Sequence, residues 1–155
     1  MNLSRFLSED RVDMALDERF DEEHPVDLES LSNHMVDLLA RSGDVVNDSK
    51  LRLDLVNRER RAPSLLGHGV ALPHVRTLQA RKLVMAIGIS HAGLPLDAPD
   101  GEPVRLVIAL VGPPYDDRQY LTAYKRLGEA LSEDGWVDRL VASEVPGEVL
   151  RALSR

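Results

Sequence analysis

The chain of 155 residues contains no cysteine, which excludes disulfide bonds, thiol nucleophiles and thiolate zinc sites. It also lacks any apolar run near the roughly 18 to 20 residues that a membrane span requires. The first 25 residues, MNLSRFLSEDRVDMALDERFDEEHP, carry charges every few positions and lack the apolar region of a signal peptide. These absences predict a soluble cytoplasmic protein that does not insert into a membrane.

The chain also lacks an excess of positive charge. It contains 26 acidic and 19 basic residues, so its formal net charge is −7. This balance argues against nucleic-acid binding as the main task. The charge is uneven: residues 51–82 hold seven basic and two acidic residues, so this segment is +5 and the remainder is −12. Two interpretations stay open: a solvated helix face with its flank, or a functional surface, which would be an anion site or a docking patch for an acidic partner.

The length of the chain suits one domain, and its apolar fraction of 43% can supply a core. We expect this domain over residues 1–155, with an N-terminal strand and acidic loop over 1–26 and a core over about 27–153. Apolar spacing and capping residues predict helices over 28–43, from 48 to about 59, and over 117–132, 134–142 and 146–154. Strands are expected over 69–73, 83–89 and 104–111, with a further one over 12–16. This order predicts an α/β sandwich, a central sheet with helices on its faces.

Side-chain roles are also predicted for the C-terminal half. The apolar positions of the helix over 117–132 are Leu121, Tyr124, Leu127 and Leu131. Trp136, Tyr115 and Tyr124 are interpreted as packing residues.

The stretch GHGVALPHVR, residues 67–76, contains two of the five histidines, His68 and His74. A zinc site would need three or four ligands, and the arginines nearby would repel a divalent cation. Ser64 lies ten residues before His74, but no Gly-x-Ser-x-Gly motif surrounds it. We therefore expect neither a metal site nor a serine hydrolase, and no cofactor.

A covalent phosphate carrier explains more of this stretch. A neutral imidazole can attack phosphorus, and its ordinary pKa is about 6.5. The phosphoimidazole carries negative charge, which arginine can hold with a planar pair of donors. Gly67 and Gly69 permit close approach of the backbone to a ligand, and Pro73 helps to hold His74 at the end of a strand.

The segment RERRAPSLLGHGVALPH, residues 58–74, resembles the active-site segment of the fructose/mannitol-type IIA domains of the bacterial phosphotransferase system, which include nitrogen-regulatory IIA proteins. The pattern of that family begins with Arg-Glu, passes Ser-Thr and Gly-x-Gly, and ends in Ala-Ile-Pro-His. Further similar segments extend the resemblance over roughly residues 1–153. It implies an α/β sandwich with a mixed sheet, a phosphorylated histidine at His74 and a phosphate-binding Arg58.

Three positions depart from the family pattern. A second histidine of the family corresponds to Tyr120, whose hydroxyl can donate a hydrogen bond but carries no charge at neutral pH. The Ser-Thr pair becomes Pro63-Ser64, and the glycine that often follows the active histidine becomes Val75, followed by Arg76. We expect Arg76 to supply the positive charge that the missing histidine would have given.

The resemblance implies a phosphocarrier that receives a phosphoryl group on His74 from an HPr-type protein and passes it to a IIB partner. Arg58 would clamp the phosphate, and the expected supporting residues are Ser64, Tyr120, Arg76, Gly67, His68 and Gly69. The alternative is a regulatory binding module of the same fold that controls a transporter or kinase. Tyr120 and the lack of an attached IIB or IIC portion favour this alternative, and whether the chain counts as an enzyme component stays open.

Overall fold

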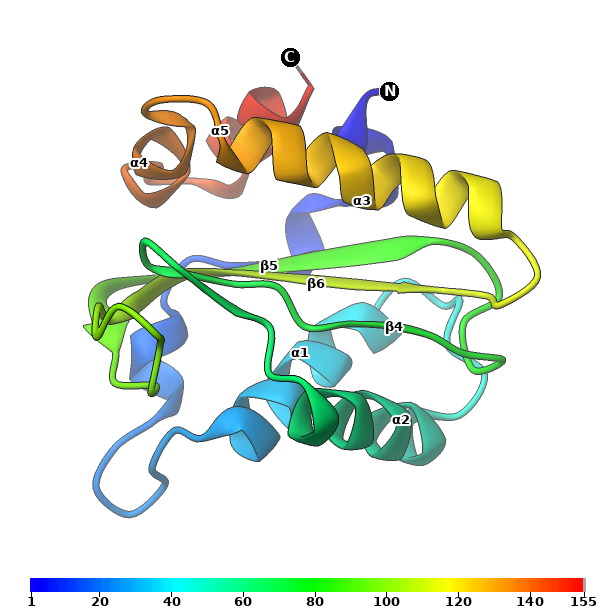
Figure 1. Cartoon of the computed structure of the whole chain (residues 1–155), viewed down its shortest axis with the longest axis horizontal. Helices are drawn as coiled ribbons and strands as arrows, with labels where there is room; N and C mark the ends of the chain where they lie inside the picture. The colour runs from blue at the N-terminus through cyan, green and yellow to red at the C-terminus, as the bar shows by residue number, and fades with distance from the viewer. Residues whose placement is uncertain (155) are drawn as a thin grey trace.

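The computed structural model describes residues 1–154 and has a six-stranded sheet between two layers of helices (Figure 1). The strands are β1 (Val12–Asp13), β2 (Leu65–Gly67), β3 (Val70–Ala71), β4 (His74–Arg76), β5 (Val84–Leu94) and β6 (Val104–Gly112). The helices are α1 (Leu28–Ala40), α2 (Asp48–Arg61), α3 (Asp117–Leu131), α4 (Trp136–Val141) and α5 (Pro146–Leu153). Three short 3₁₀ helices, η1 (Leu3–Phe6), η2 (Glu9–Arg11) and η3 (Leu16–Arg19), precede them. The predicted α/β sandwich is confirmed.

The sheet is mixed, with the order β1-β5-β6-β3-β2 and with β4 also pairing with β6. Strands β5 and β6 form its antiparallel centre, while β1 runs parallel to β5 and both β3 and β4 run parallel to β6. α1 and α2 cover one face, and α3, α4 and α5 cover the other (Figure 1).

Alternation along β6 separates two apolar cores. Leu106, Ile108 and Leu110 belong to the core under α3, α4 and α5. Val107 and Ala109 belong to the core under α1 and α2. Because both faces of this strand are apolar and buried, its register cannot slip by one residue without exchanging the two sets of side chains.

The structure corrects several predicted strands. β5 continues to Leu94, beyond the predicted end at residue 89, since this part of the chain still pairs with β6. β2 and β4 were not expected, and the strand predicted over 12–16 is limited to two residues before η3 begins. The helices agree with the prediction to within two residues at most ends, and α1 and α2 begin at side-chain caps that the sequence shows. No helix among residues 1–154 combines the length and apolar character needed to cross a membrane.

A buried carboxylate fastens the N-terminal segment to α1. Asp13 accepts hydrogen bonds from His34 Nε2 at 2.8 Å, from Arg19 Nε at 2.9 Å and from the amide of Ala15 at 3.0 Å. Burial alone would raise the pKa of Asp13, but these donors outweigh it and hold the pKa well below its usual range. His34 therefore helps to fasten α1 to the N-terminal segment.

Replacing Asp13 by Asn is expected to lower the free energy of unfolding by about 2 kcal/mol, a typical value for hydrogen bonds to a charged group. Since the folded-state pKa is lowered, the stabilisation by Asp13 is complete above its unfolded-state pKa of about 4 and is lost as the pH falls below that value. Urea unfolding between neutral pH and pH 3 measures both effects. Asp10→Asn, which changes an exposed carboxylate of the same segment, is the control, and equal losses in the two variants would contradict the assignment.

Candidate functional site

His74 begins strand β4, between the ends of α2 and α3 (Figure 1). Among residues 1–154, its strand pairs with β6 and with no other strand, so the opposite edge of β4 is open. Side chains two positions apart in a strand point to the same face, which places His74 and Arg76 together. They line a pocket of about 430 Å³ with residues of the two helices. The sequence thus places a histidine and an arginine on the same face of strand β4.

The backbone sets the tautomer of His74. The carbonyl of Pro73 accepts from the amide of Leu110 in β6, so the preceding carbonyl, that of Leu72, points the other way, toward the open edge. That carbonyl lies 2.6 Å from His74 Nδ1. A carbonyl oxygen only accepts, so Nδ1 carries the proton and donates it. The lone pair of the ring is therefore on Nε2.

Arg58 faces that lone pair. Its Nη2 lies 3.3 Å from His74 Nε2, and its Nη1 donates to the carbonyl of Ala62 at 2.8 Å, which holds the guanidinium at the end of α2. Burial of the ring is the largest influence on the pKa of His74 and lowers it. The charge of Arg58 lowers this pKa further, against the opposing effects of the Leu72 carbonyl and Glu59. The imidazole is thus neutral at neutral pH and has the lone pair that a nucleophile requires.

A buried carboxylate is linked to the ring of His74 through Ser64. Glu59 is 2% exposed and accepts from the amide of Ser64 at 2.7 Å and from its hydroxyl at 2.9 Å. The hydroxyl of Ser64 lies 3.4 Å from His74 Nδ1. The sequence contained one signal for Glu59: a carboxylate in the last turn of a helix faces the unfavourable end of the helix dipole. Such a position indicates a specific contact, and here the contact is Ser64.

Arg76 and two tyrosines complete the pocket. Arg76 forms an ion pair with Asp117, and its guanidinium carbon lies 5.6 Å from the centre of the Tyr120 ring. Tyr120 is 5% exposed, and burial raises the pKa of its phenol far above the usual value, so it stays a neutral donor. The ring of Tyr124 lies against His74, with 4.9 Å between ring centres and planes tilted by 50°.

The apolar face predicted for helix α3 is wrong at Leu121 and Tyr124, whereas Leu127 is buried and Leu131 packs against the core as predicted. Its buried positions are Tyr120, Ala123, Leu127 and Ala130, while Leu121 is 55% and Tyr124 39% exposed. Small alanines allow the helix to approach the sheet closely, which the apolar pattern alone did not indicate. Tyr124 was interpreted as a packing residue and instead contacts the histidine, and Tyr115 is exposed, whereas Trp136 is buried as predicted.

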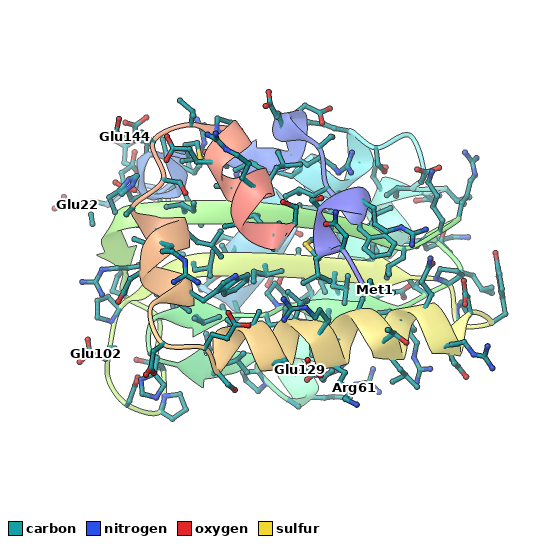
Figure 2. The ribbon with its side chains drawn as sticks, turned by 90° about the horizontal axis from the view of Figure 1, so that it is seen from above. Met1, Glu22, Arg61, Glu102, Glu129 and Glu144 are labelled. Atoms are coloured by element: carbon teal, nitrogen blue, oxygen red, sulfur yellow. The ribbon has the colours of Figure 1, made fainter. Side chains whose placement is uncertain are left out.

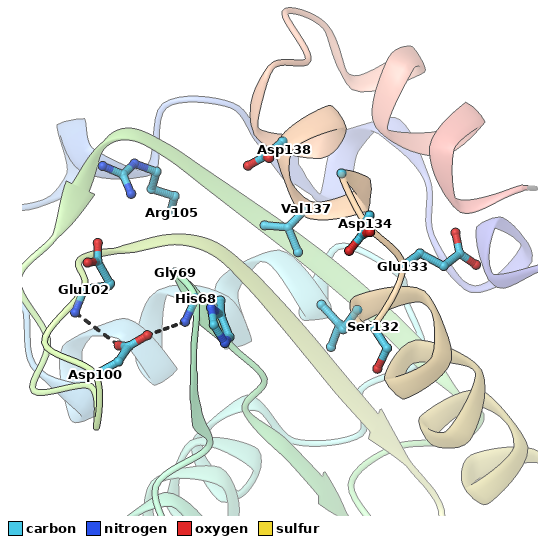
Figure 3. A pocket seen from close by; sticks show the side chains of 12 residues that line it. His68, Gly69, Asp100, Glu102, Arg105, Ser132, Glu133, Asp134, Val137 and Asp138 are labelled. Carbon is cyan, nitrogen blue, oxygen red and sulfur yellow. Dashed lines mark hydrogen bonds between the residues drawn. The ribbon is translucent and has the colours of Figure 1, made fainter.

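The structure brings Arg58, Ser64, Arg76 and Tyr120 to His74. Gly67, His68 and Gly69 do not line this pocket; His68 and Gly69 line a second pocket of about 580 Å³ beside Asp100, Glu102 and Arg105 (Figure 3). All three have positive φ, with His68 at 53°. The amide of His68 donates to Asp100 at 2.7 Å, which helps to hold this strained turn between β2 and β3. Within the described chain, no group of three or more His, Asp or Glu side chains is arranged to hold a metal ion.

Solved structures share this architecture. The nitrogen regulatory protein IIA-Ntr from Neisseria meningitidis matches with a TM-score of 0.80 and 24% identity, over 97% of this chain and 98% of that one. The mannitol enzyme IIA in the complex of enzyme IIAMTL and phosphorylated enzyme IIBMTL from Escherichia coli matches with a TM-score of 0.74 and 19% identity, over 95% and 96%. The chain therefore has the fold of phosphotransferase-system IIA domains.

The sequence then identifies the family. Residues 22–155 match the family "Phosphoenolpyruvate-dependent sugar phosphotransferase system, EIIA 2", and the chain belongs to it. The fructose-specific EIIA component from Haloferax volcanii is 28% identical over 124 residues, which cover 79% of this chain and 80% of that protein. The chain spans only about a fifth of the fructose-specific EIIABC component from Bacillus subtilis, to which it is 24% identical over 127 residues.

The geometry predicts how the pKa of His74 responds to Arg58. In the variant Arg58→Gln the pKa is expected to rise, because a nearby positive charge that disfavours the imidazolium is removed. Titration of the imidazole signals by NMR measures this shift. Arg60→Gln is the control, since Arg60 is on the same helix as Arg58 but pairs with Glu29 of α1 and does not line the pocket. A fall in the pKa, or an equal change in both variants, would show that Arg58 does not face Nε2 in solution.

Proposed function

We propose that the chain is a cytoplasmic phosphocarrier of the phosphoenolpyruvate-dependent phosphotransferase system. His74 receives a phosphoryl group from the phosphohistidine of an HPr-type protein and passes it to a IIB partner. The observation that carries the proposal is the orientation of His74, with Nδ1 donating to the Leu72 carbonyl and Nε2 facing Arg58. Membership of the EIIA 2 family supports it, and so does the IIB partner of the structurally similar mannitol enzyme.

The transfer needs no proton from the pocket. The lone pair of His74 Nε2 attacks phosphorus and forms a new N–P bond, while the N–P bond of the donor breaks and its electron pair leaves with the donor imidazole. In the second step, the nucleophile of the IIB partner attacks the same phosphorus and His74 leaves with its electron pair. Positioning and charge stabilisation dominate such reactions, so neither step calls for a cofactor.

Three side chains are placed to stabilise the charge. Arg58 is the phosphate clamp, since its Nη2 already lies 3.3 Å from the attacking nitrogen. Tyr120 is a neutral hydrogen-bond donor in the same pocket. Arg76 adds a second guanidinium on the same side of β4, held in place by Asp117 and by the Tyr120 ring. Hydrogen bonds from charged donors are roughly twice as strong as neutral ones, so Arg58 is expected to contribute most.

A regulatory role is the second candidate, and the observation that favours it is Tyr120. A buried neutral phenol stands where the resemblance places a second histidine, which weakens transfer more than it weakens phosphate binding. In this case the phosphorylation state of His74 would control a target protein, such as a transporter or kinase, instead of supplying a sugar pathway.

Labelling with phosphoenolpyruvate, enzyme I and HPr tests the carrier function. The wild-type chain is expected to gain one acid-labile phosphate, and His74→Ala is expected to gain none. Arg58→Gln is expected to accept phosphate about 100-fold more slowly, the typical effect of losing one donor to developing charge. His68→Ala is the matched control, because His68 lies outside the pocket of His74. The proposal would be contradicted if the wild-type chain gained no label or if His74→Ala were labelled as well.

Substitutions at Tyr120 separate the two candidates. If the tyrosine assists transfer, Tyr120→Phe slows transfer from phosphorylated His74 to a IIB domain about 3- to 10-fold, the equivalent of one neutral hydrogen bond. If the tyrosine restrains transfer, Tyr120→His accelerates this step and Tyr120→Phe leaves it unchanged. Rapid-quench measurements distinguish these results, with Tyr115→Phe as the control, since Tyr115 is exposed. The first result supports the carrier, and the second supports the regulator.

A further inference from the structure

Ser64 links the end of α2 to the chain just before His74. Its carbonyl accepts from the amide of Leu72 at 2.9 Å. The amide and the carbonyl of one residue in an extended segment point the same way, so this bond also directs the Leu72 carbonyl toward Nδ1 of His74, 2.6 Å away. The hydroxyl of Ser64 lies 3.4 Å from the same nitrogen. Ser64 therefore holds the acceptor of the Nδ1 proton and is itself a second, more distant acceptor.

Glu59 fixes the direction of the Ser64 hydroxyl. Both oxygens of this buried carboxylate accept from Ser64, one from the amide at 2.7 Å and one from the hydroxyl at 2.9 Å. A hydroxyl has one proton, so with that proton donated to Glu59 it can only accept from Nδ1. Ser64 is 7% exposed, which shields these contacts from solvent. The hydrogen bonds thus run in one direction, from Nδ1 to the hydroxyl and from the hydroxyl to Glu59.

The charges around the ring oppose one another. The titratable and charged groups come from three elements: Arg58, Glu59 and Arg61 from α2, Arg76 from β4, and Tyr120 and Tyr124 from α3. Arg61 lies at the outer edge of the molecule (Figure 2), and Arg76 is paired with Asp117. Burial is the largest influence on the pKa of His74 and lowers it, and the charge of Arg58 acts in the same direction. The Leu72 carbonyl and the negative charge of Glu59 raise this pKa, so both favour a proton on the ring.

That proton decides how the phosphoryl group can leave. When the lone pair of Nε2 forms the N–P bond, the ring keeps its proton on Nδ1 and gains a positive charge. In onward transfer the N–P bond breaks, its electron pair returns to Nε2 and the ring becomes a neutral imidazole. If Nδ1 lost its proton in between, the leaving group would be an imidazolate anion, which leaves far less readily.

We propose that Glu59, acting through Ser64, is a positioning residue that keeps the proton on Nδ1 while Nε2 carries the phosphoryl group. This inference rests on the proposed carrier function and concerns the release of the phosphoryl group rather than its capture. Both hydrogen bonds of Glu59 go to Ser64, so its charge acts on the ring through one intervening hydroxyl. Arg58 holds the phosphate on one side of the ring, and Glu59 balances its charge on the other.

The test follows the Nδ1 proton in the phosphorylated chain. Phosphoramidate, a small chemical donor, phosphorylates His74 without a protein partner, and NMR of the ring nitrogens measures the titration, with His74→Ala to identify the signals. In Glu59→Gln the phosphorylated ring is expected to lose its proton about one pH unit lower than in wild type, because a nearby negative charge is removed. Asp54→Asn is the control, since Asp54 lies on the same helix but bonds to Thr77.

Variants of Ser64 show whether the hydroxyl carries the effect. Ser64→Ala is expected to shift the titration in the same direction, and the double variant with Glu59→Gln is expected to shift it no further than the larger single change. Ser64→Thr restores a hydroxyl and is expected to titrate as wild type does. Should Glu59→Gln fail to fold, the comparison of Ser64→Ala with Ser64→Thr decides the matter alone.

A rate measurement connects the proton with transfer. Transfer from phosphorylated His74 to the IIB domain encoded in the same genome is expected to slow as the pH rises through the pKa of the phosphorylated ring. Above the pKa values of both proteins, Glu59→Gln is expected to be about tenfold slower than wild type, the equivalent of one pH unit. A merely structural role for Glu59 would lower the rate equally at every pH and leave the titration unchanged.

The two proposals fail in different ways. A shifted titration without transfer to the IIB domain supports the role of Glu59 and counts against the carrier function alone. Equal titrations of wild type, Glu59→Gln and Ser64→Ala, or no phosphorylation of His74 by phosphoramidate, would overturn the role of Glu59.

Discussion

The pairing of β4 with β6 is the constraint from which the site is built. β3 and β4 keep one register against β6, with Val70 opposite Leu106 and His74 opposite Leu110, across the interruption at Pro73. Since β6 is buried on both faces and its register is fixed, the pairing with β6 also fixes the position of His74 within the sandwich. α2 and α3, packed on opposite faces, then bring an arginine and two tyrosines to it from either side (Figure 1).

This register also determines which atom of His74 can react. The amide of Leu110 in β6 donates to the carbonyl of Pro73. The carbonyl of Leu72 is therefore left at the open edge, where it accepts a hydrogen bond from Nδ1 of His74. The nitrogen that keeps the lone pair is therefore selected by the backbone rather than by a titrating side chain. Glu59 acts at greater distance, since it holds Ser64, which lies near the same Nδ1. A carboxylate bonded directly to Nδ1 would favour the charged imidazolium, whereas a carbonyl provides orientation with a weaker effect on charge.

The sequence predicted long elements well and short ones poorly, for a physical reason. α1 and α2 begin at side-chain caps, Asp27 and Asn47, and such local signals can be read from neighbouring residues. β2 and β4 are three residues long, and pairing across the sheet defines them, which no local pattern encodes. The phase of α3 could not be decided locally either, because Leu121 and Tyr124 form as regular an apolar stripe as Tyr120 and Ala123. For the site, the resemblance pointed to His74 and Arg58 directly. The contacts of Glu59 and Tyr124 could not be predicted, because they depend on how elements distant in sequence pack together.

The departures at Tyr120 and Arg76 have a common electrostatic consequence. A second histidine would change its charge near neutral pH, so the phosphate affinity of such a pocket would depend on two titrations. Here the phenol of Tyr120 is kept neutral by burial, which raises its pKa, and a guanidinium stays charged. Arg76 is further fixed by Asp117 and by the Tyr120 ring, so its charge is constant in position as well as in sign. Burial and the charge of Arg58 lower the pKa of His74, so its imidazole is neutral at neutral pH as well. In the proposed carrier, the side chains that surround a phosphate on His74 therefore keep the same charge across neutral pH.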